Sequence, residues 1–269
     1  MQPAQQPPRH SIIDSRLHLP DPSLTPSPVT SWNLDEAGFV RYLDRCGVER
    51  GVVHAVRPPS TGGAGGYAAA NRKVLRFVEK HKNRFTAACI LDPGSVEESL
   101  REMEEWKRRF GMVWVGELRF APREQGFPRD AFDRLMRHAV SLGMVVTVNT
   151  DMDGVNELAR THSQATVVLA QLEAGADRPE LLRRIEVAAG GKNFYVEAGP
   201  RGYERMGLVE FAVDRVGANR VLYGSNFATT SAAAVIARVD NAFLSPEHKE
   251  AILFRNTQTL LEKVGWRFQ

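Results

Sequence analysis

Short runs of β-branched and apolar residues recur along the chain, and several of them are apolar almost throughout. Continuous runs of this kind are typical of parallel strands that are buried on both faces. Amphipathic stretches separate the runs, with apolar residues at helical spacing. The expected strands are Ser11–Asp14, Gly51–Val56, Thr86–Leu91, Val113–Leu118, Val145–Val148, Thr166–Leu169, Phe194–Val196 and Arg220–Tyr223. The expected helices are Leu34–Cys46, Val96–Phe110, Ala131–Leu142, Gly154–Thr161, Pro179–Ala189, Glu204–Val216, Ala232–Phe243 and Pro246–Val264.

This regular alternation of strands and helices predicts an α/β fold with a parallel sheet. Eight strand–helix units in roughly 255 residues favour a closed (β/α)8 barrel, a TIM barrel, over an open doubly wound sheet. The barrel is expected to form a single domain over residues 11–269, after a flexible tail over residues 1–10.

Two segments between the runs are rich in residues that oppose regular structure. Leu19–Thr30 contains four prolines and is expected to be an extended loop. Thr61–Gly66, which reads TGGAGG, is expected to be a loop that forms a lid over the barrel mouth. A phosphate-binding loop would end in Lys-Ser or Lys-Thr, whereas Tyr67 and Ala68 follow here.

Composition and charge exclude several functions. Hydrophobic residues make up 43% of the chain and charged residues 25%, as in globular proteins with a large core. The formal net charge is +3 and no block of like charges occurs, so we expect no nucleic-acid partner, while an anionic small-molecule ligand remains open. The chain contains neither a secretory apolar segment near its start nor an apolar run long enough to span a membrane, which predicts a cytoplasmic protein without a membrane partner. Cys46 and Cys89 are expected to be buried free thiols.

Several segments carry polar residues close to where strands of the barrel would end. In order and spacing they resemble landmark segments of the amidohydrolase superfamily, and more closely its amidohydrolase-related branch of metal-dependent hydrolases and decarboxylases. The resemblance spans about residues 11–262 and implies the same (β/α)8 barrel. The segments are Ile12–Leu19 (IIDSRLHL), Asn83–Pro93, Gly143–Asn149 (GMVVTVN), Val167–Leu172 (VVLAQL) and Arg220–Asn226 (RVLYGSN), together with Asn256 in the last helix.

The resemblance implies a catalytic metal at the carboxyl ends of the strands, where barrel active sites form. Its implied ligands are two histidines separated by one residue on strand 1, single histidines ending strands 5 and 6, and an aspartate ending strand 8. Some branches add an acidic residue or a modified lysine on strand 4. This chain departs from the pattern at most positions, which are occupied by Arg16, His18, Asn149, Gln171 and Asn226, with Glu117 near the end of strand 4.

These exchanges predict that the site holds no catalytic zinc or similar divalent ion, and we expect no other cofactor. Zinc needs three or four good donors, and amide oxygens bind it poorly. Arg16 is a permanent cation, which would repel a metal by roughly 4 kcal/mol at 4 Å if each is counted as a unit charge and the effective dielectric is near 20. In the family the strand 8 aspartate takes a proton from the attacking water. Because the amide of Asn226 cannot accept that proton, the usual hydrolytic mechanism is also expected to be lost.

The polar residues are expected to converge on one pocket. In one interpretation they satisfy one another, with Arg16 paired to Glu117. In the other they form a ligand site in which His18, Glu117 and Glu197 transfer protons. In that site Arg16 and Arg119 would orient a carboxylate, a lactone or a sugar. The predicted substrate-binding residues are Arg16, Arg119, Asn149, Gln171, Asn226, Arg201 and Tyr203, the last two also compatible with a solvated loop.

Three functions remain open from the sequence. The first is a metal-independent, hydrolase-like enzyme acting on a small carboxylated or lactone-like substrate. The second is a non-catalytic pseudoenzyme that binds a metabolite or a partner protein, and the third is a metal-dependent hydrolase or decarboxylase with atypical ligands. A fold alone does not choose among them. A homo-oligomer also remains open, although no obvious dimer stripe marks the helices.

Overall fold

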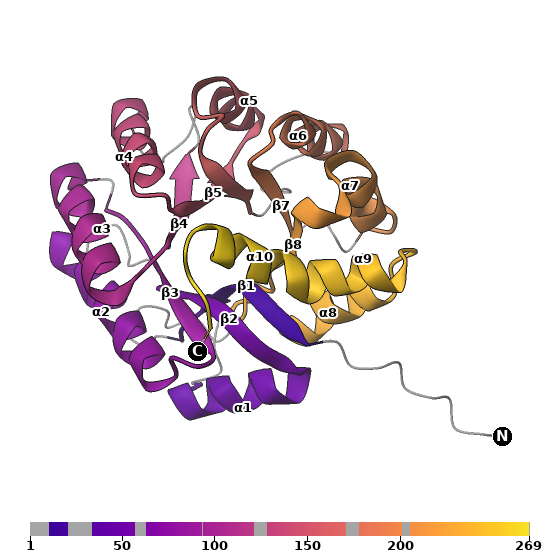
Figure 1. Cartoon of the computed structure of the whole chain (residues 1–269), viewed down its shortest axis with the longest axis horizontal. Helices are drawn as coiled ribbons and strands as arrows, with labels where there is room; N and C mark the ends of the chain where they lie inside the picture. The colour runs from indigo at the N-terminus through magenta and orange to yellow at the C-terminus, as the bar shows by residue number, and fades with distance from the viewer. Residues whose placement is uncertain are drawn as a thin grey trace.

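In the computed structural model, eight parallel strands form one sheet in chain order and the helices lie around its outside (Figure 1). The structure describes residues 11–20, 34–56, 63–92, 94–120, 128–170, 178–200 and 205–268. The strands are β1 (Ile12–His18), β2 (Val48–His54), β3 (Phe85–Cys89), β4 (Trp114–Phe120), β5 (Val145–Thr150), β6 (Thr166–Leu169), β7 (Phe194–Ala198) and β8 (Val221–Tyr223). The helices are α1 (Glu36–Cys46), α2 (Gly63–Lys80), α3 (Val96–Phe110), α4 (Arg129–Ser141), α5 (Met152–Thr161), α6 (Arg178–Gly190), α7 (Leu208–Val216), α8 (Ala232–Asp240), α9 (Pro246–Glu250) and α10 (Asn256–Lys263). The predicted single-domain (β/α)8 barrel is confirmed.

Backbone contacts close the barrel between its last and first strands. Leu17 of β1 forms a parallel bridge with Phe227, which follows β8. The N–H of Asn226 donates to the carbonyl of Arg16 at 2.9 Å. This closure brings Asn226 beside Arg16 and His18 at the carboxyl end of β1.

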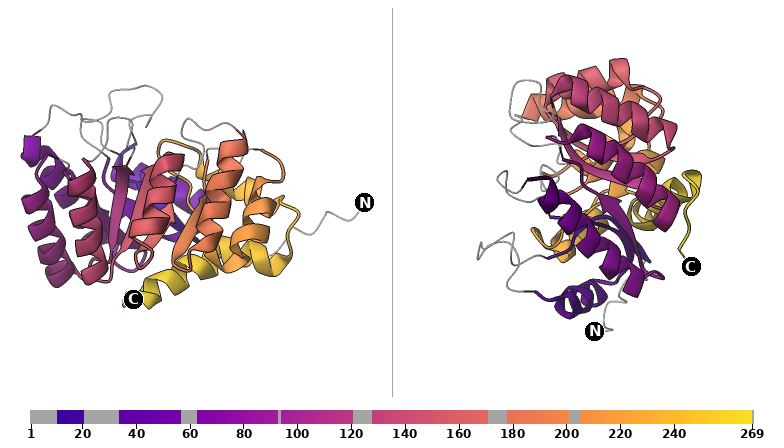
Figure 2. Two further views of the ribbon diagram at one scale, coloured as in Figure 1. Left: turned by 90° about the horizontal axis from the view of Figure 1, so that it is seen from above. Right: turned by 90° about the vertical axis from the view of Figure 1, so that its left-hand side faces the viewer.

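Apolar side chains form two clusters, one on each side of the sheet. The larger cluster lies between the strands and the surrounding helices. The smaller cluster, which we call the amino-end layer, fills the barrel interior near the start of the strands, and α10 lies across that end (Figures 1 and 2). Because side chains alternate along a regular strand, Thr147 and Asn149 of β5 lie on the same face as Val145, closer to the carboxyl end. The amino-end layer contains Val52, Ala88, Val113, Trp114, Val145, Val168, Leu222, Leu260 and Leu261.

Helix α2 was not anticipated from the sequence. The expected loop over Thr61–Gly66 is wrong from Gly63 onward, because α2 begins there and runs for 18 residues. Residues 61–62 lie outside the described part of the chain. Glycine costs about 1 kcal/mol per residue in a helix, but here it is confined to the first turns. Further along, Val74 and Phe77 are buried against the sheet, so packing of the later turns stabilises the whole helix.

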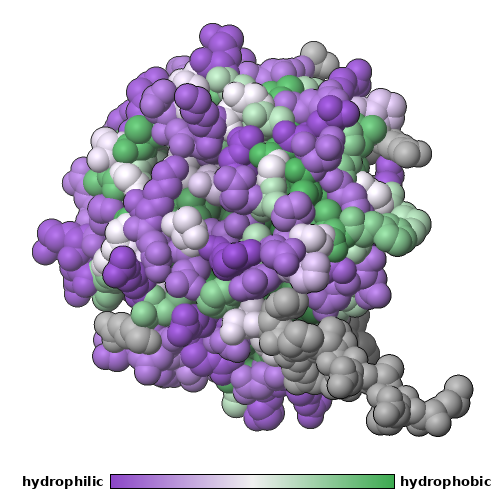
Figure 3. Space-filling view, turned by 45° about the vertical axis from the view of Figure 1, so that its right-hand side comes forward, coloured by the Kyte–Doolittle hydropathy of each residue, from purple (hydrophilic) through white to green (hydrophobic). Residues whose placement is uncertain are grey.

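The face shown in Figure 3 is mostly hydrophilic, and the two cysteines are not joined to each other. Hydrophobic side chains occur on this face in small groups. Within the described ranges, no helix is both long and apolar enough to cross a membrane. Cys89 is a buried free thiol as predicted, whereas Cys46 is free but only partly buried. The predicted tail over residues 1–10 lies outside the described residues.

Candidate functional site

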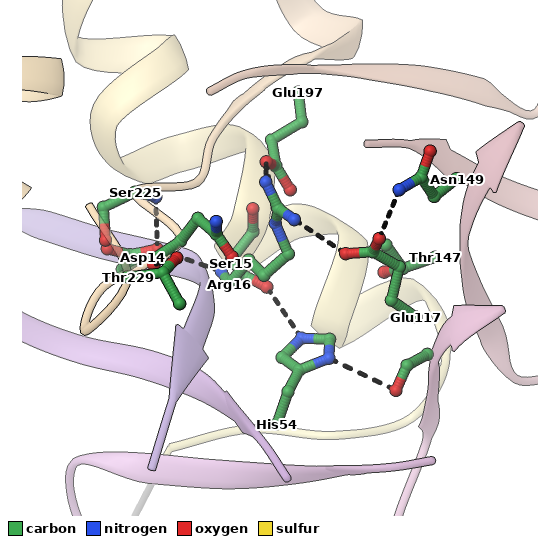
Figure 4. A network of polar contacts seen from close by, with 12 residues as sticks. Asp14, Ser15, Arg16, His54, Glu117, Thr147, Asn149, Glu197, Ser225 and Thr229 are labelled. Atoms are coloured by element: carbon green, nitrogen blue, oxygen red, sulfur yellow. Dashed lines mark hydrogen bonds and ion pairs between the residues drawn. The ribbon is translucent and has the colours of Figure 1, made fainter. Parts of the chain in front are cut away.

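A buried ion-pair network occupies the carboxyl-end half of the barrel interior (Figure 4). Arg16 of β1 has an exposed fraction of 0%. Its Nη1 donates to Oε2 of Glu117 on β4 at 2.7 Å, and its Nε donates to Oε1 of Glu197 on β7 at 2.9 Å. Its Nη2 also lies 2.6 Å from Oε1 of Glu197. One guanidinium therefore joins three strands that are not neighbours in the sheet, and the anticipated pair with Glu117 is extended by Glu197.

Glu117 is an ionised carboxylate with both oxygens engaged. Besides the ion pair with Arg16, its Oε1 accepts a hydrogen bond from Nδ2 of Asn149 at 2.7 Å. Burial opposes ionisation of Glu117, but the charge of Arg16 and the hydrogen bonds from Asn149 and Arg16 outweigh it. The pKa of Glu117 therefore lies below its ordinary value.

Glu197 is the more deeply buried of the two glutamates, with 1% of its surface exposed. Within the described part of the chain, its Oε2 has no hydrogen-bond partner. Burial raises the pKa of Glu197 to about 7, because it outweighs the charge and the hydrogen bond of Arg16. A Cβ atom at Gly224 would lie 2.4 Å from Cδ of Glu197, so only glycine leaves room for this side chain.

Two histidines beside the network are uncharged at neutral pH. The ring centroids of His18 and His54 are 5.7 Å apart. His54 is fully buried, and its ring nitrogens lie 3.3 and 3.4 Å from the carbonyl oxygens of Ser15 and Gly116, only one of which can accept a hydrogen bond from the single N–H of a neutral ring. Burial lowers the pKa of His54 to about 3. It also lowers the pKa of His18 to about 4, although part of this side chain reaches solvent. The nearby charge of Arg16 acts in the same direction on both rings.

A second group of predicted residues lies closer to the barrel mouth. The side chain of Asn226 is hydrogen-bonded to His18, and Asn149 is partly exposed. Arg119 is exposed near the end of β4, in register with Asn149 of β5. Of the residues that the structure describes, those towards the mouth therefore include two amides, a neutral imidazole and the exposed guanidinium of Arg119. The remaining predicted residues, Gln171, Arg201 and Tyr203, lie outside the described residues.

Asp14 is a further acidic residue of the site that sequence reasoning missed. Its Oδ1 accepts the backbone N–H groups of Arg16 and Ser225, at 2.9 and 3.0 Å, and so ties β1 to the end of β8 (Figure 4). Burial raises its pKa to about 6, more than the hydrogen bonds from Ser225 and Arg16 lower it. The strand pattern could not have revealed it, because the pairing of β1 with β2 shifts in register between Asp14 and Leu17, so simple alternation does not place the Asp14 side chain.

The described side chains of the site do not fit a divalent metal. The two carboxylates of the network, Glu117 and Glu197, are both ion-paired to Arg16. The amides of Asn149 and Asn226 are weak donors for such ions. In the part of the chain that the structure describes, no group of three or more His, Cys, Asp and Glu side chains is placed to hold a metal ion.

Comparison with known protein families identifies the chain. Residues 63–263, well over half of the sequence, match the family model described as amidohydrolase. The chain belongs to the amidohydrolase family. The family resemblance predicted from the strand-end segments is confirmed. No curated protein sequence matches this amidohydrolase.

Solved structures share the barrel over nearly the whole chain. An uncharacterized TIM-barrel protein from Bordetella bronchiseptica aligns with a TM-score of 0.75 and 17% identity, covering 95% of this chain and 100% of that one. A 2,6-dihydroxybenzoate decarboxylase from Rhizobium aligns with a TM-score of 0.70 and 13% identity, covering 96% and 100%. A probable 2-pyrone-4,6-dicarboxylic acid hydrolase from Acinetobacter baumannii aligns with a TM-score of 0.66 and 14% identity, covering 95% and 100%. At these identities the likeness shows the fold alone, and proteins with this fold include both decarboxylases and hydrolases.

Proposed function

We propose that this amidohydrolase-family barrel binds a small carboxylated or lactone-like molecule at the carboxyl ends of its strands, without a divalent metal. The observation that carries the proposal is the buried guanidinium of Arg16 between Glu117 and Glu197. A metal at this position would have to displace a permanent cation and two short ion pairs. It would also gain only weak amide donors in return.

Among the described residues, the polar groups towards the mouth belong to uncharged side chains and to Arg119. The amides of Asn149 and Asn226 and the neutral ring of His18 lie towards the mouth, with Arg119 at its edge. Such donors bind a carboxylate, or the carbonyl oxygen of a lactone, without a metal. From their sequence positions, Gln171, Arg201 and Tyr203 are proposed to contribute to the same site.

Proteins of the same fold support this class of ligand. A 2,6-dihydroxybenzoate decarboxylase has been solved with 2,6-dihydroxybenzoate, and the Acinetobacter hydrolase with citric acid. Both ligands are small and carry carboxylates. A decarboxylase from Polaromonas holds manganese and an amidohydrolase from Burkholderia multivorans holds zinc. We propose that this chain shares the class of ligand with such proteins but not the metal.

A second candidate function, metal-independent hydrolysis of a lactone or ester, is favoured by Glu197. Its pKa of about 7 suits a group that both accepts and donates a proton at neutral pH. Within the described residues its Oε2 is unpartnered. In this scheme Glu197 and His18 transfer protons, while Glu117 stays ionised between Arg16 and Asn149.

Metal analysis and a ligand screen test these functions. We expect protein purified without chelators to contain far less than one equivalent of zinc, manganese or nickel, and a stoichiometric metal would overturn the proposal. In thermal-shift measurements, 2,6-dihydroxybenzoate, citrate or a carboxylated lactone should stabilise the protein, and uncharged resorcinol should not. A ligand at a hundred times its dissociation constant adds about 2.7 kcal/mol.

Variants separate binding from turnover. Arg119→Ala and Asn149→Ala should reduce the ligand-induced shift, whereas Arg109→Ala, on the outer surface of α3, should not. Turnover of a lactone or ester that disappears in Glu197→Gln would support the second candidate. Ligand binding without any turnover supports a non-catalytic barrel.

A further inference from the structure

The geometry points to Arg16 as the replacement for the family's metal, a built-in cation that holds the carboxylates of β4 and β7 across the barrel. The inference rests on the proposed absence of a divalent metal. It also changes the role expected for Arg16 from the sequence. Arg16 becomes a positioning residue that acts on a ligand through its neighbours.

The guanidinium is suited to this role because its donors point in fixed, different directions within one plane. Nη1 faces Glu117, while Nε and Nη2 face Glu197, at distances of 2.6 to 2.9 Å. A metal ion would draw such carboxylates together in a similar way. A lysine ammonium is a point charge on a flexible stem and does not span two carboxylates with the same fixed geometry.

The surrounding backbone keeps Arg16 inside the barrel. Its N–H donates to Asp14 and its carbonyl accepts from the N–H of Asn226. Because the side chain is fully buried, it could reach a ligand at the mouth only after both ion pairs had broken. Glu117 instead links Arg16 to Asn149, which is partly exposed. The influence of Arg16 on a ligand therefore passes through this pair.

The charges of Arg16, Glu117 and Glu197 are consistent with Arg16 taking the place of a metal. A divalent ion would neutralise two carboxylates, whereas Arg16 carries one positive charge. Glu117 is ionised, and the more deeply buried Glu197 has a pKa raised to about 7. A guanidinium and one proton together supply the charge that a divalent metal would bring.

Removing the guanidinium should allow a metal to bind. We would titrate ZnCl2 and MnCl2 by calorimetry into the wild type, Arg16→Ala and Arg16→His. The Arg16 variants should take up about one equivalent, at least about tenfold more tightly than any binding to the wild type. This binding should be lost when Glu117→Gln and Glu197→Gln are added. Arg16→Lys retains the charge and should remain free of metal.

Arg184→Ala is the matched control. Arg184 on α6 is also buried and ion-paired, to Glu180, but it lies outside the barrel interior. Its removal should therefore destabilise the protein without creating a metal site.

Chemical rescue covers the case in which the variants fold poorly. Millimolar guanidinium should raise the thermal midpoint of Arg16→Ala by about 3 °C, or restore its folded circular dichroism signal on refolding, and sodium chloride should do neither. Stoichiometric metal in the wild type would overturn the proposed function itself. A metal-free wild type whose Arg16 variants gain neither metal nor rescue would overturn only this inference, as would metal uptake by Arg16→Lys or Arg184→Ala.

Discussion

The two halves of the barrel interior are built by the same strands but held together by different forces. In the amino-end layer, residues such as Val52, Val145 and Leu222 are buried and apolar, and each stabilises the fold by leaving water. The polar atom of Trp114 is satisfied there by Thr147, whose Oγ1 lies 2.8 Å from its Nε1. This layer depends on the volume that its side chains fill.

In the carboxyl-end half, each charged group is unfavourable alone and is stabilised only by its partners. Burying Arg16, Glu117 or Glu197 singly would cost several kcal/mol, and the network offsets that cost through three short contacts. The amino-end layer should therefore tolerate changes that preserve volume. The ion-pair network should tolerate only changes that remove its charges together.

The largest effect is expected when the central cation is removed. Arg16→Met leaves Glu117 and Glu197 buried without their partner and should lower the free energy of unfolding by about 3–5 kcal/mol, measured by urea denaturation. The triple variant that adds Glu117→Gln and Glu197→Gln should regain much of this loss, because no unpaired charge remains. A loss in Arg16→Met of less than about 1 kcal/mol, the size expected for an exposed ion pair, would show that the network is not stabilised in this way.

In the amino-end layer, a substitution is expected to lower the free energy of unfolding strongly without changing ligand binding. Leu222→Ala opens a cavity beneath the site and should cost about 2–4 kcal/mol in urea denaturation. The ligand-induced thermal shift and the metal content should stay as in the wild type. Altered ligand binding in this variant, measured well below its thermal midpoint, would show that the two halves are coupled.

Much of the fold could be predicted from the sequence, because continuous apolar runs reveal strands that are buried on both faces. Strand β6 has the predicted bounds, Thr166–Leu169, and α3 has its predicted bounds, Val96–Phe110. The helix that was missed, α2, begins with glycines whose local preference opposes it, and only its later packing decides the outcome. Local signals fail where tertiary contacts override them.

The site was predicted in part, for a related reason. The pair between Arg16 and Glu117 could be anticipated because both residues lie near strand ends with opposite charge. The convergence of Glu197 on the same guanidinium depends on how far each strand is staggered around the barrel. The need for glycine at position 224, where any side chain would clash with Glu197, is likewise visible only in three dimensions.

A smaller loss of stability is expected when the close contact between Gly224 and Glu197 is disturbed. Gly224→Ala would place a methyl group 2.4 Å from Cδ of Glu197, so the carboxylate must shift. The expected loss is about 1–3 kcal/mol in urea denaturation, as for other overpacked sites. Gly190→Ala is the control, because a Cβ atom there meets nothing within 4 Å, and its stability should change little. Equal effects of the two substitutions would argue against a close fit around Glu197.

The smallest effect concerns the dependence of stability on pH, which differs between the two halves because only one contains titratable groups. Burial gives folded Glu197 a pKa of about 7, above its ordinary value of 4.5. The folded state therefore holds this proton more tightly than the unfolded state. The stability that the proton contributes is fully present below about pH 4.5 and is lost as the pH rises through 7.

Glu197→Gln isolates this contribution, because glutamine does not titrate and the opposing effects of His18 and His54 remain in both proteins. Urea denaturation at pH 5 and pH 8 should show that the wild type loses on the order of 1–2 kcal/mol more than the variant over this interval. Leu222→Ala should change with pH as the wild type does. If Glu197→Gln and the wild type respond alike, Glu197 is ionised throughout. The guanidinium of Arg16 would then balance both carboxylates without a proton, and metal-independent hydrolysis would lose its acid.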